Sequence, residues 1–192
     1  MSATTRIFMA VELSEEIRSS LGRMQQRLRQ SGARVSWVRP DNIHLTLVFI
    51  GDVFSSSGIP EIERAMDCVT ATVPPFTLTV EGAGTFGSAK APRVIWAGAN
   101  DSSGVLIRLQ SRLATAVREL GIPLESRPFH PHLTLGRVRS RHGADALTQA
   151  LASASVARNS LEVDRVQLFE SQLHPDGARH TILHSATLKG EP

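Results

Sequence analysis

Residues 39–47 read RPDNIHLTL and residues 127–135 read RPFHPHLTL, so one pattern occurs twice in this chain. Both copies fit RP-x-x-x-HLTL, with six identical positions in the same register, and their histidines are 132 − 44 = 88 residues apart. A single HLTL is weak evidence, whereas two copies that each follow Arg-Pro indicate an internal repeat. Such a repeat predicts two similar lobes that face each other.

Both HLTL segments lie in stretches that predict strands, and side chains alternate between the two faces of a strand. His44 and Thr46 therefore share one face, and the leucines between and after them share the other. The same alternation separates His132 and Thr134 from the leucines of the second copy. We expect the leucines in the core. If a pseudo-two-fold relates the lobes, two imidazoles and two hydroxyls line the groove between them.

Two imidazoles in one groove suit attack on a phosphodiester. A neutral His takes a proton from the attacking water, and a protonated His gives one to the leaving oxygen. The reference pKa of imidazole is about 6.5, so both forms are accessible, and each proton transfer typically contributes about 10² to 10⁴ in rate. Thr hydroxyls stabilise the nonbridging oxygens as charge develops. We therefore expect His44 and His132 to be catalytic and Thr46 and Thr134 to bind substrate.

A metal site is a second interpretation of the same histidines, because His ligands often occur in clusters. Neither motif carries Asp or Glu within its strand, so the acidic partners are missing. A five-membered cyclic phosphate is already strained, and it needs no metal when its leaving oxygen is protonated on departure. The pattern therefore favours an acid–base pair, with no metal and no cofactor.

The remainder of the chain predicts strands joined by short turns and several helices. Alternation of apolar residues predicts strands at 6–13, 34–38, 43–50, 76–86, 93–99, 132–138, 161–173 and 178–188. Helical spacing predicts one helix from the Ser14 N-cap to Gly32, one that begins at Pro60, and two over 103–120 and 143–154. His174-Pro175-Asp176-Gly177 is a strong turn signal between the last two strands. Antiparallel pairing of such strands predicts an α+β fold.

Length and composition place this chain among ordinary soluble proteins. It has 192 residues, of which 41% are hydrophobic and 20% charged. Loops are expected at 52–58, 87–92 and 139–143, and none has the composition of a free linker. Residues 1–192 are therefore expected to form a single domain made of two lobes.

Arginine supplies most of the basic charge. The formal net charge is +3, the sequence pI is about 9.9, and Lys occurs only at positions 90 and 189. Arginine binds phosphate bidentately, which suits a phosphate-handling protein, although Arg-favouring codons explain the same composition. The mild basic balance predicts a modest, salt-sensitive affinity for nucleic acid.

Cys68 is the only cysteine, so the chain has no intrachain disulfide. It lies beside Met66 and Val69 in a predicted helix, and we expect a buried structural thiol. The N-terminal stretch has no cleavable apolar core, and no apolar run approaches the roughly 20 residues that span a bilayer. These features predict a soluble, cytoplasmic protein, and nothing in them calls for an obligate oligomer, so we expect a monomer.

Five segments resemble the RNA 2',3'-cyclic phosphodiesterases, also called 2'-5' RNA ligases, within the two-histidine phosphoesterases. The resemblance covers nearly the whole chain. The segments are RIFMAVELSEEIR at 6–18, WVRPDNIHLTLVFIGDV at 37–53, GTFGSAKAPRVIWAGA at 84–99, RPFHPHLTLGRV at 127–138 and LFESQLHPDGARHTIL at 168–183. The two His-x-Thr motifs occur across the whole superfamily, and the flanking segments narrow the resemblance to this branch.

The resemblance implies a bilobal α+β fold, with antiparallel sheets lining a central cleft and helices outside. It implies hydrolysis of a 2',3'-cyclic phosphate to a 2'-phosphomonoester, together with weak, reversible 2'-5' joining of RNA ends. It assigns His132 as the general base and His44 as the general acid, and symmetry leaves the reverse open. Arg137 follows the second motif as the family's Arg does, and it is either a phosphate ligand or a surface side chain.

One departure from the family is visible in the closing hairpin. His180 stands where the family commonly has Tyr, and the chain has no Tyr at all. His180 and His184 are expected on one strand face, and we interpret them as structural or groove-lining rather than as a metal pair. Phe129 and Trp37 lie close to the motifs and can stack on a base, although core packing is the favoured role for each.

Two other functions are compatible with the same residues. A binding module that holds RNA ends without turnover keeps the groove, although intact duplicated motifs argue against it. A phosphodiesterase for small cyclic or 2'-5' nucleotides keeps the chemistry as well. The expected partners are therefore RNA ends or small nucleotides that carry a 2',3'-cyclic phosphate.

Overall fold

The computed structural model describes residues 5–53, 58–88, 91–154, 158–174 and 177–191. Their strands are β1 (Thr5–Glu12), β2 (Val35–Trp37), β3 (His44–Val53), β4 (Phe76–Ser88), β5 (Ala91–Asn100), β6 (His132–Val138), β7 (Asn159–Val163), β8 (Arg165–His174) and β9 (Gly177–Thr187). The helices are α1 (Glu15–Arg29), α2 (Ile59–Thr70), α3 (Val105–Glu119) and α4 (Ala144–Ser153), with a short 3₁₀ turn η1 (Pro40–Asn42). The predicted α+β fold class is confirmed.

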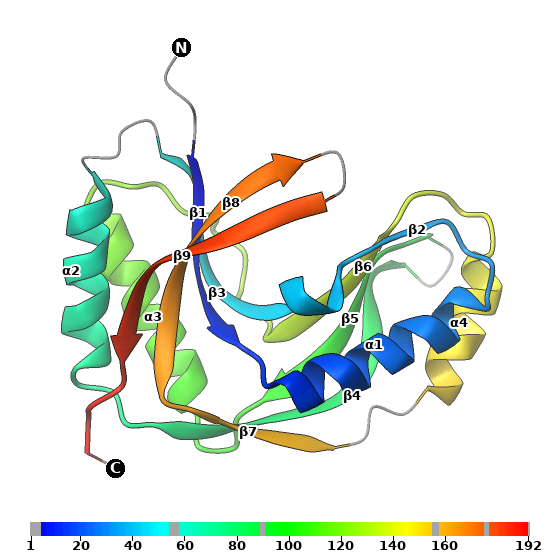
Figure 1. Cartoon of the computed structure of the whole chain (residues 1–192), viewed down its shortest axis with the longest axis horizontal. Coiled ribbons are helices and arrows are strands. Elements are labelled where there is room, and N and C mark those ends of the chain that lie inside the picture. Colours follow the sequence, from blue (N-terminus) through cyan, green and yellow to red (C-terminus); the bar gives the residue numbers. More distant parts are fainter. Residues whose placement is uncertain (1–4, 54–57, 89–90, 155–157, 175–176, 192) are drawn as a thin grey trace.

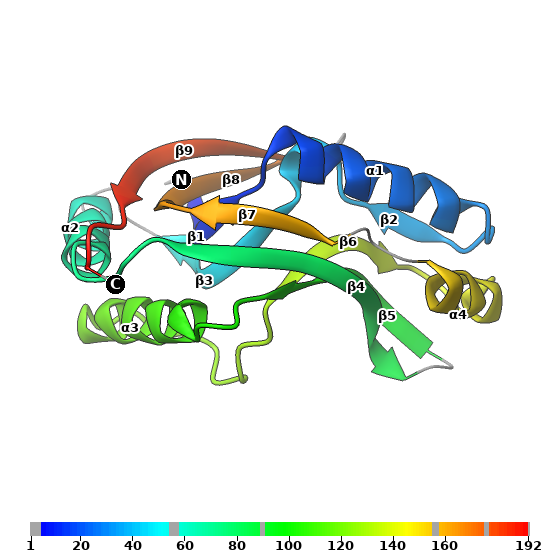
Figure 2. The same ribbon diagram turned by 90° about the horizontal axis from the view of Figure 1, so that it is seen from below.

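The strands form one curled antiparallel sheet made of two halves. Its order is β7-β4-β5-β6-β3-β1-β8-β9, and β2 pairs with β6. The halves meet where β3 lies beside β6, and a single residue pair, Leu45 with Leu133, joins them. In both views α2 and α3 lie at one end of the molecule, whereas α1 and α4 lie at the other (Figures 1 and 2). Each half of the sheet therefore has its own pair of helices.

The sequence repeat coincides with the junction between the halves. Leu45 and Leu133 are the same position of the HLTL pattern, and they face each other across an antiparallel pair. Equivalent residues that pair in this way place a local pseudo-two-fold axis between the two strands. Outward from the axis, β3 pairs with β1 and then β8, while β6 pairs with β5 and then β4. The predicted similarity of the lobes is thus visible in the strand order.

The face of the sheet opposite the histidines is part of the core. Leu45, Leu133 and Leu135 are fully buried, and Leu47 is 3% exposed. Helix α3 packs against β3, and α2 packs against β8 and β9. In the other half, the buried Gln25 of α1 donates from its side-chain amide to the Leu135 carbonyl at 2.8 Å and to the Val38 carbonyl at 2.7 Å. These contacts hold both HLTL strands from behind.

Helix α1 begins and ends as its sequence predicts. The Ser14 side chain accepts from the Ile17 amide at 3.4 Å, and two glutamates occupy the first turn. The last helical residue is Arg29, and Gly32 follows at φ +70°, a backbone conformation that side chains disfavour. Pro60 lies at the start of α2, also as predicted.

Three expectations are corrected by the structure. The predicted strand 161–173 is two strands, because the chain leaves β4 after Val163, turns at Asp164 and then pairs with β1. Cys68 is exposed, since it lies two residues after the buried Met66 and a helix turns about 200° over that step. The loop expected at 87–92 is shorter, because β4 reaches Ser88 and β5 begins at Ala91.

Part of the predicted loop 52–58 and the middle of the predicted turn at 174–177 lie outside the described residues. In the part of the chain that the structure describes, no helix is both long and apolar enough to cross a membrane.

Candidate active site

Both His-x-Thr motifs lie on one face of the sheet. Opposite residues of an antiparallel pair share a face, so Leu45 and Leu133 point the same way, and the side chains on either side of each leucine point the other way. We call the face that carries His44, Thr46, His132 and Thr134 the histidine face. In a regular ladder, diagonal partners such as His44 and His132 lie about 7–8 Å apart, a span that one phosphate group can bridge.

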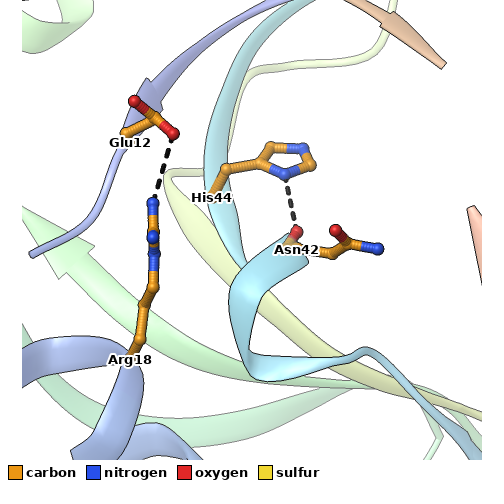
Figure 3. A network of polar contacts seen from close by, with 4 residues as sticks. All are labelled: Glu12, Arg18, Asn42 and His44. Carbon is orange, nitrogen blue, oxygen red and sulfur yellow. Dashed lines mark hydrogen bonds and ion pairs between the residues drawn. The ribbon is translucent and has the colours of Figure 1, made fainter. Parts of the chain in front are cut away.

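The two histidines are held in the same way. Nδ1 of His44 lies 2.8 Å from the Asn42 carbonyl, and Nδ1 of His132 lies 2.7 Å from the His130 carbonyl. A carbonyl oxygen only accepts, so Nδ1 carries a hydrogen in each ring and Nε2 remains for proton transfer. Figure 3 shows the second nitrogen of His44 pointing away from Asn42. The repeat therefore reproduces the tautomer of the imidazole as well as its position.

Aromatic rings enclose His44. The Phe8 ring is stacked on it, with centroids 4.7 Å apart and planes 22° apart, and the His180 ring meets it edge-on at 5.3 Å. Phe169 stacks on the Phe8 ring in turn, with centroids 5.2 Å apart. Burial and the nearby charge of His180 lower the pKa of His44 to about 4, against the effect of its bond to Asn42. His44 is therefore neutral at pH 7 in the free protein.

His132 lies in a more open setting. Its one ring contact among the described residues is with Phe86, which meets it edge-on with centroids 4.8 Å apart and planes 86° apart. Phe86 in turn contacts the Trp96 ring at 5.6 Å. The two imidazoles thus have equivalent backbone support but unequal access to water.

A β-bulge brings Arg137 to the histidine face. Simple alternation would place Arg137 on the other face of the sheet from Thr134, because the two residues are three positions apart on one strand. The ladder with β5 shifts by one between Thr134, opposite Trp96, and Gly136, opposite Ile95. Beyond the bulge Arg137 lies opposite Val94, which shares a face with Trp96. The exposed Arg137 side chain therefore continues the line of His132 and Thr134.

The first repeat contains the equivalent bulge. The ladder between β1 and β3 shifts between Thr46, opposite Ala10, and Val48, opposite Met9. Phe49, five residues after His44 as Arg137 is five after His132, then lies opposite Phe8 on the histidine face. Phe49 is 56% exposed, so an aromatic side chain occupies the position that mirrors the arginine.

The carboxylate of Glu12, the residue that pairs with His44 in the ladder, binds an arginine and not the imidazole. Glu12 lies directly across from His44 in the ladder, but its Oε1 accepts from the Arg18 guanidinium at 3.2 Å (Figure 3). Among the residues that the structure describes, no group of three or more His, Cys, Asp or Glu side chains is arranged to hold a metal ion.

The predicted pairing of His180 with His184 on one face is wrong. A bulge in β9 places Ile182 opposite Phe169 and His184 opposite the buried Leu168, so the two histidines face opposite sides. His180 lines the site beside His44, and groove lining is one of the two roles expected for it. His184 takes the other role, because its Nε2 lies 2.8 Å from an Asp67 carboxylate oxygen on α2.

Trp37 and Phe129 pack against the core, as expected, and the Arg29 guanidinium covers the Trp37 ring at 5.0 Å. The residues that sequence reasoning missed are the aromatic ones around the histidines, namely Phe8, Phe49, Phe86 and Phe169. The available signal was alternation in the first strand, where Phe8 lies between the core residues Ile7 and Met9.

Comparison with known proteins agrees with this geometry. An RNA 2',3'-cyclic phosphodiesterase of Methanothermobacter thermautotrophicus is 33% identical over 177 residues, which cover 92% of this chain and 95% of that protein. One from Thermotoga maritima is 29% identical over 185 residues, which cover 96% of each.

Solved structures share the fold. A Thermus thermophilus protein matches with a TM-score of 0.80 at 29% identity, covering 97% of this chain and 100% of the other. Escherichia coli LigT in complex with 3'-AMP matches with a TM-score of 0.74 at 29% identity, covering 97% of this chain and 99% of the other. The model of the LigT-like phosphoesterases matches residues 11–96 and again 99–180, so each match contains one His-x-Thr motif. This chain therefore belongs to the LigT-like phosphoesterase family.

Proposed function

We propose that this chain hydrolyses 2',3'-cyclic phosphates at RNA ends and leaves a 2'-phosphomonoester. The observation that carries the proposal is the pair of histidines on one face, each with Nδ1 bound to a carbonyl and Nε2 left for proton transfer. Relatives that match nearly the whole chain are RNA 2',3'-cyclic phosphodiesterases. The proposed reaction needs only a water molecule and the two imidazoles, with no cofactor and no metal.

The reaction breaks the bond between phosphorus and the 3' oxygen. A base removes a proton from water as the water oxygen bonds to phosphorus. An acid delivers a proton to the departing 3' oxygen, so the 2' ester remains and protons balance. When the 5' hydroxyl of another RNA end attacks in place of water, the same exchange joins the ends through a 2'-5' bond and the 3' oxygen again leaves with a proton. We propose this joining as a minor activity.

We assign His132 as the base and His44 as the acid. Because the pKa of His44 is lowered to about 4 in the free protein, this assignment requires that the anionic phosphate raise it on binding. Thr46, Thr134 and Arg137 share the histidine face with the pair, and we propose that they bind the nonbridging phosphate oxygens.

We further propose a cytoplasmic monomer whose residues 1–192 form one domain of two lobes. The two successive family matches and the sheet that joins both halves support the single domain. The nearest alternative substrate is a small cyclic or 2'-5' nucleotide. A non-catalytic RNA-end-binding module is the other alternative, and the matched support of both imidazoles argues against it.

The test is hydrolysis of an RNA that ends in a 2',3'-cyclic phosphate, in the presence of EDTA. Wild type is compared with His44→Ala, His132→Ala and the control His142→Ala, which removes an exposed histidine from the turn before α4. We expect a 2'-phosphate product from wild type and control, and a loss of about 10² to 10⁴ in rate for each site variant. Turnover that is indifferent to both site variants, or absent from wild type, would refute the proposed function.

A change of leaving group tests the roles. A phosphodiester that releases p-nitrophenolate does not need a proton on its leaving oxygen, so it bypasses the acid but still needs the base. With His44 as the acid, this substrate should restore turnover to His44→Ala and not to His132→Ala. Rescue of His132→Ala alone would reverse the assignment.

A further inference from the structure

Basic residues of this chain are concentrated in two stretches that contain no Asp or Glu. Residues 17–40 hold six arginines and residues 126–144 hold four, so ten of the 21 Lys and Arg residues lie in these stretches and all 18 acidic residues lie outside them. The small net charge of +3 is therefore the sum of two strongly basic stretches and an acidic remainder. A segregated basic surface is typical of proteins that bind a polyanion.

The fold brings the two stretches together. Strand β2 pairs with β6, with Ser36 opposite Arg137, and just beyond the pair the Arg139 amide donates to the Arg34 carbonyl at 2.8 Å. Arg34, Arg137 and Arg139 are thus neighbours although they come from distant parts of the sequence. All three side chains are exposed.

These arginines extend from the histidine face. Ser36 lies opposite Arg137 and so shares its face, and the Arg139 side chain donates from Nε to the Ser36 hydroxyl at 2.7 Å. Arg34 precedes Ser36 by two residues, so alternation gives it the same side. We call Arg34, Arg137 and Arg139 the arginine track. It follows Thr134 along β6 and ends just beyond the strand, at Arg139.

Charge on the track is not neutralised within the described part of the protein. Several other arginines form ion pairs with carboxylates, such as Arg18 with Glu12 and Arg127 with Glu125. None of the three track arginines forms an ion pair with any residue among those that the structure describes. Three guanidiniums without a carboxylate on one surface leave donors for phosphate oxygens.

The arginine track extends farther from the histidines than one nucleotide can reach. His132 and Arg139 are seven residues apart, and the bulge takes up one of these steps, so at about 3.3 Å per residue they lie about 20 Å apart along the strand. A cyclic mononucleotide at the histidines does not reach the far end. We propose that the phosphates of the RNA strand that leads away from the cyclic end lie along the arginine track, so the preferred substrate is an oligonucleotide. This inference rests on the proposed function and names its substrate class.

The test compares a cyclic-phosphate-ended oligonucleotide with a 2',3'-cyclic mononucleotide. The variant Arg34→Gln/Arg139→Gln removes two charges from the track and leaves Arg137 in place. The control Arg108→Gln/Arg118→Gln removes two exposed charges from α3, at the other end of the molecule. The conservative double variant to Lys keeps the charge.

For the track variant we expect KM for the oligonucleotide to rise about tenfold at low salt. The slope of log kcat/KM against log salt should become shallower by about 1.4, since each single-strand phosphate contact contributes about 0.7. Mononucleotide turnover should stay within about twofold, and the Lys variant should restore most of the oligonucleotide effect. If the track variant loses kcat/KM equally on both substrates, or if the α3 control loses as much as the track variant, the arginine track does not bind the RNA strand.

Failure of the proposed function gives a different result. In that case wild type turns over neither substrate, and the variants cannot differ. If wild type instead turns over both substrates with the same kcat/KM and the same salt slope, the phosphodiesterase stands and the arginine track is wrong.

Discussion

His44 owes its protonation state mainly to burial, and Phe8 is one of the rings that bury it. The Phe8 ring lies against the imidazole at 4.7 Å, and burial is the largest cause of its lowered pKa. We predict that Phe8→Ala admits water to the ring and raises the pKa of His44 from about 4 toward its ordinary value of about 6.5. The measurement is titration of the His44 ring proton by NMR.

Phe8→Leu serves as the matched variant, because it retains apolar volume over the imidazole and should keep the low pKa. Phe8 is 4% exposed, and its truncation to Ala costs about 3–5 kcal/mol of stability, so the titration of Phe8→Ala is interpreted only where that protein is folded. An unchanged pKa in a folded Phe8→Ala protein would show that the sheet rather than the phenylalanine excludes water from His44.

At the scale of the element, the packing of strand β4 depends on Gly84, which lies beneath the Trp96 indole. A Cβ added at Gly84 would lie 2.5 Å from the Trp96 ring, and Trp96 lies directly across from Gly84 in the ladder and next to Thr134 on the other side. We predict that Gly84→Ala displaces the indole and costs about 1–3 kcal/mol. Urea unfolding gives the cost, and a shift in tryptophan emission reports the displacement.

Gly58→Ala is the control for this substitution. The position precedes α2, its backbone φ is −84°, and nothing lies within 4 Å of a Cβ built there. It should leave both stability and emission close to wild type. If Gly84→Ala is equally silent, the indole has room to move and the glycine is not required by packing.

Strand bulges set the limit of what the sequence predicts at this scale. Alternation correctly separates His44 and Thr46 from the buried Leu45, because that stretch is regular. The same rule fails three residues later, where a bulge in each repeat brings Phe49 and Arg137 to the histidine face. It fails again for His184. A bulge is decided by the partner strand, and the partner is not visible in local spacing.

At the scale of the whole molecule, the repeat predicts two lobes but not how the chain connects them. The pairing of Leu45 with Leu133 follows from the pseudo-two-fold, since equivalent strands meet at the axis. The crossing at Asp164 does not follow, because β7 and β8 read as one continuous strand and only their partners, β4 and β1, lie in different halves. Tertiary pairing overrides local pattern there.

The same burial that tunes His44 has a consequence for the stability of the entire protein. Between pH 6.5 and about 4 the unfolded chain binds a proton at this residue that the folded protein does not. The stability of the folded state therefore falls as pH decreases through this window, by about 3 kcal/mol from His44 alone, and the contribution is complete above about pH 6.5. Urea unfolding at pH 7 and at pH 4 measures the difference.

The variant that isolates this contribution is His44→Asn, whose side-chain amide can still donate to the Asn42 carbonyl but does not titrate. We expect it to lose about 3 kcal/mol less than wild type between the two pH values, with carboxylate effects common to both proteins cancelling. His142→Asn, at an exposed position, should behave as wild type. An identical loss in His44→Asn and wild type would mean that the folded protein accepts the proton on His44 without penalty, and it would remove the requirement that substrate raise the pKa of the proposed acid.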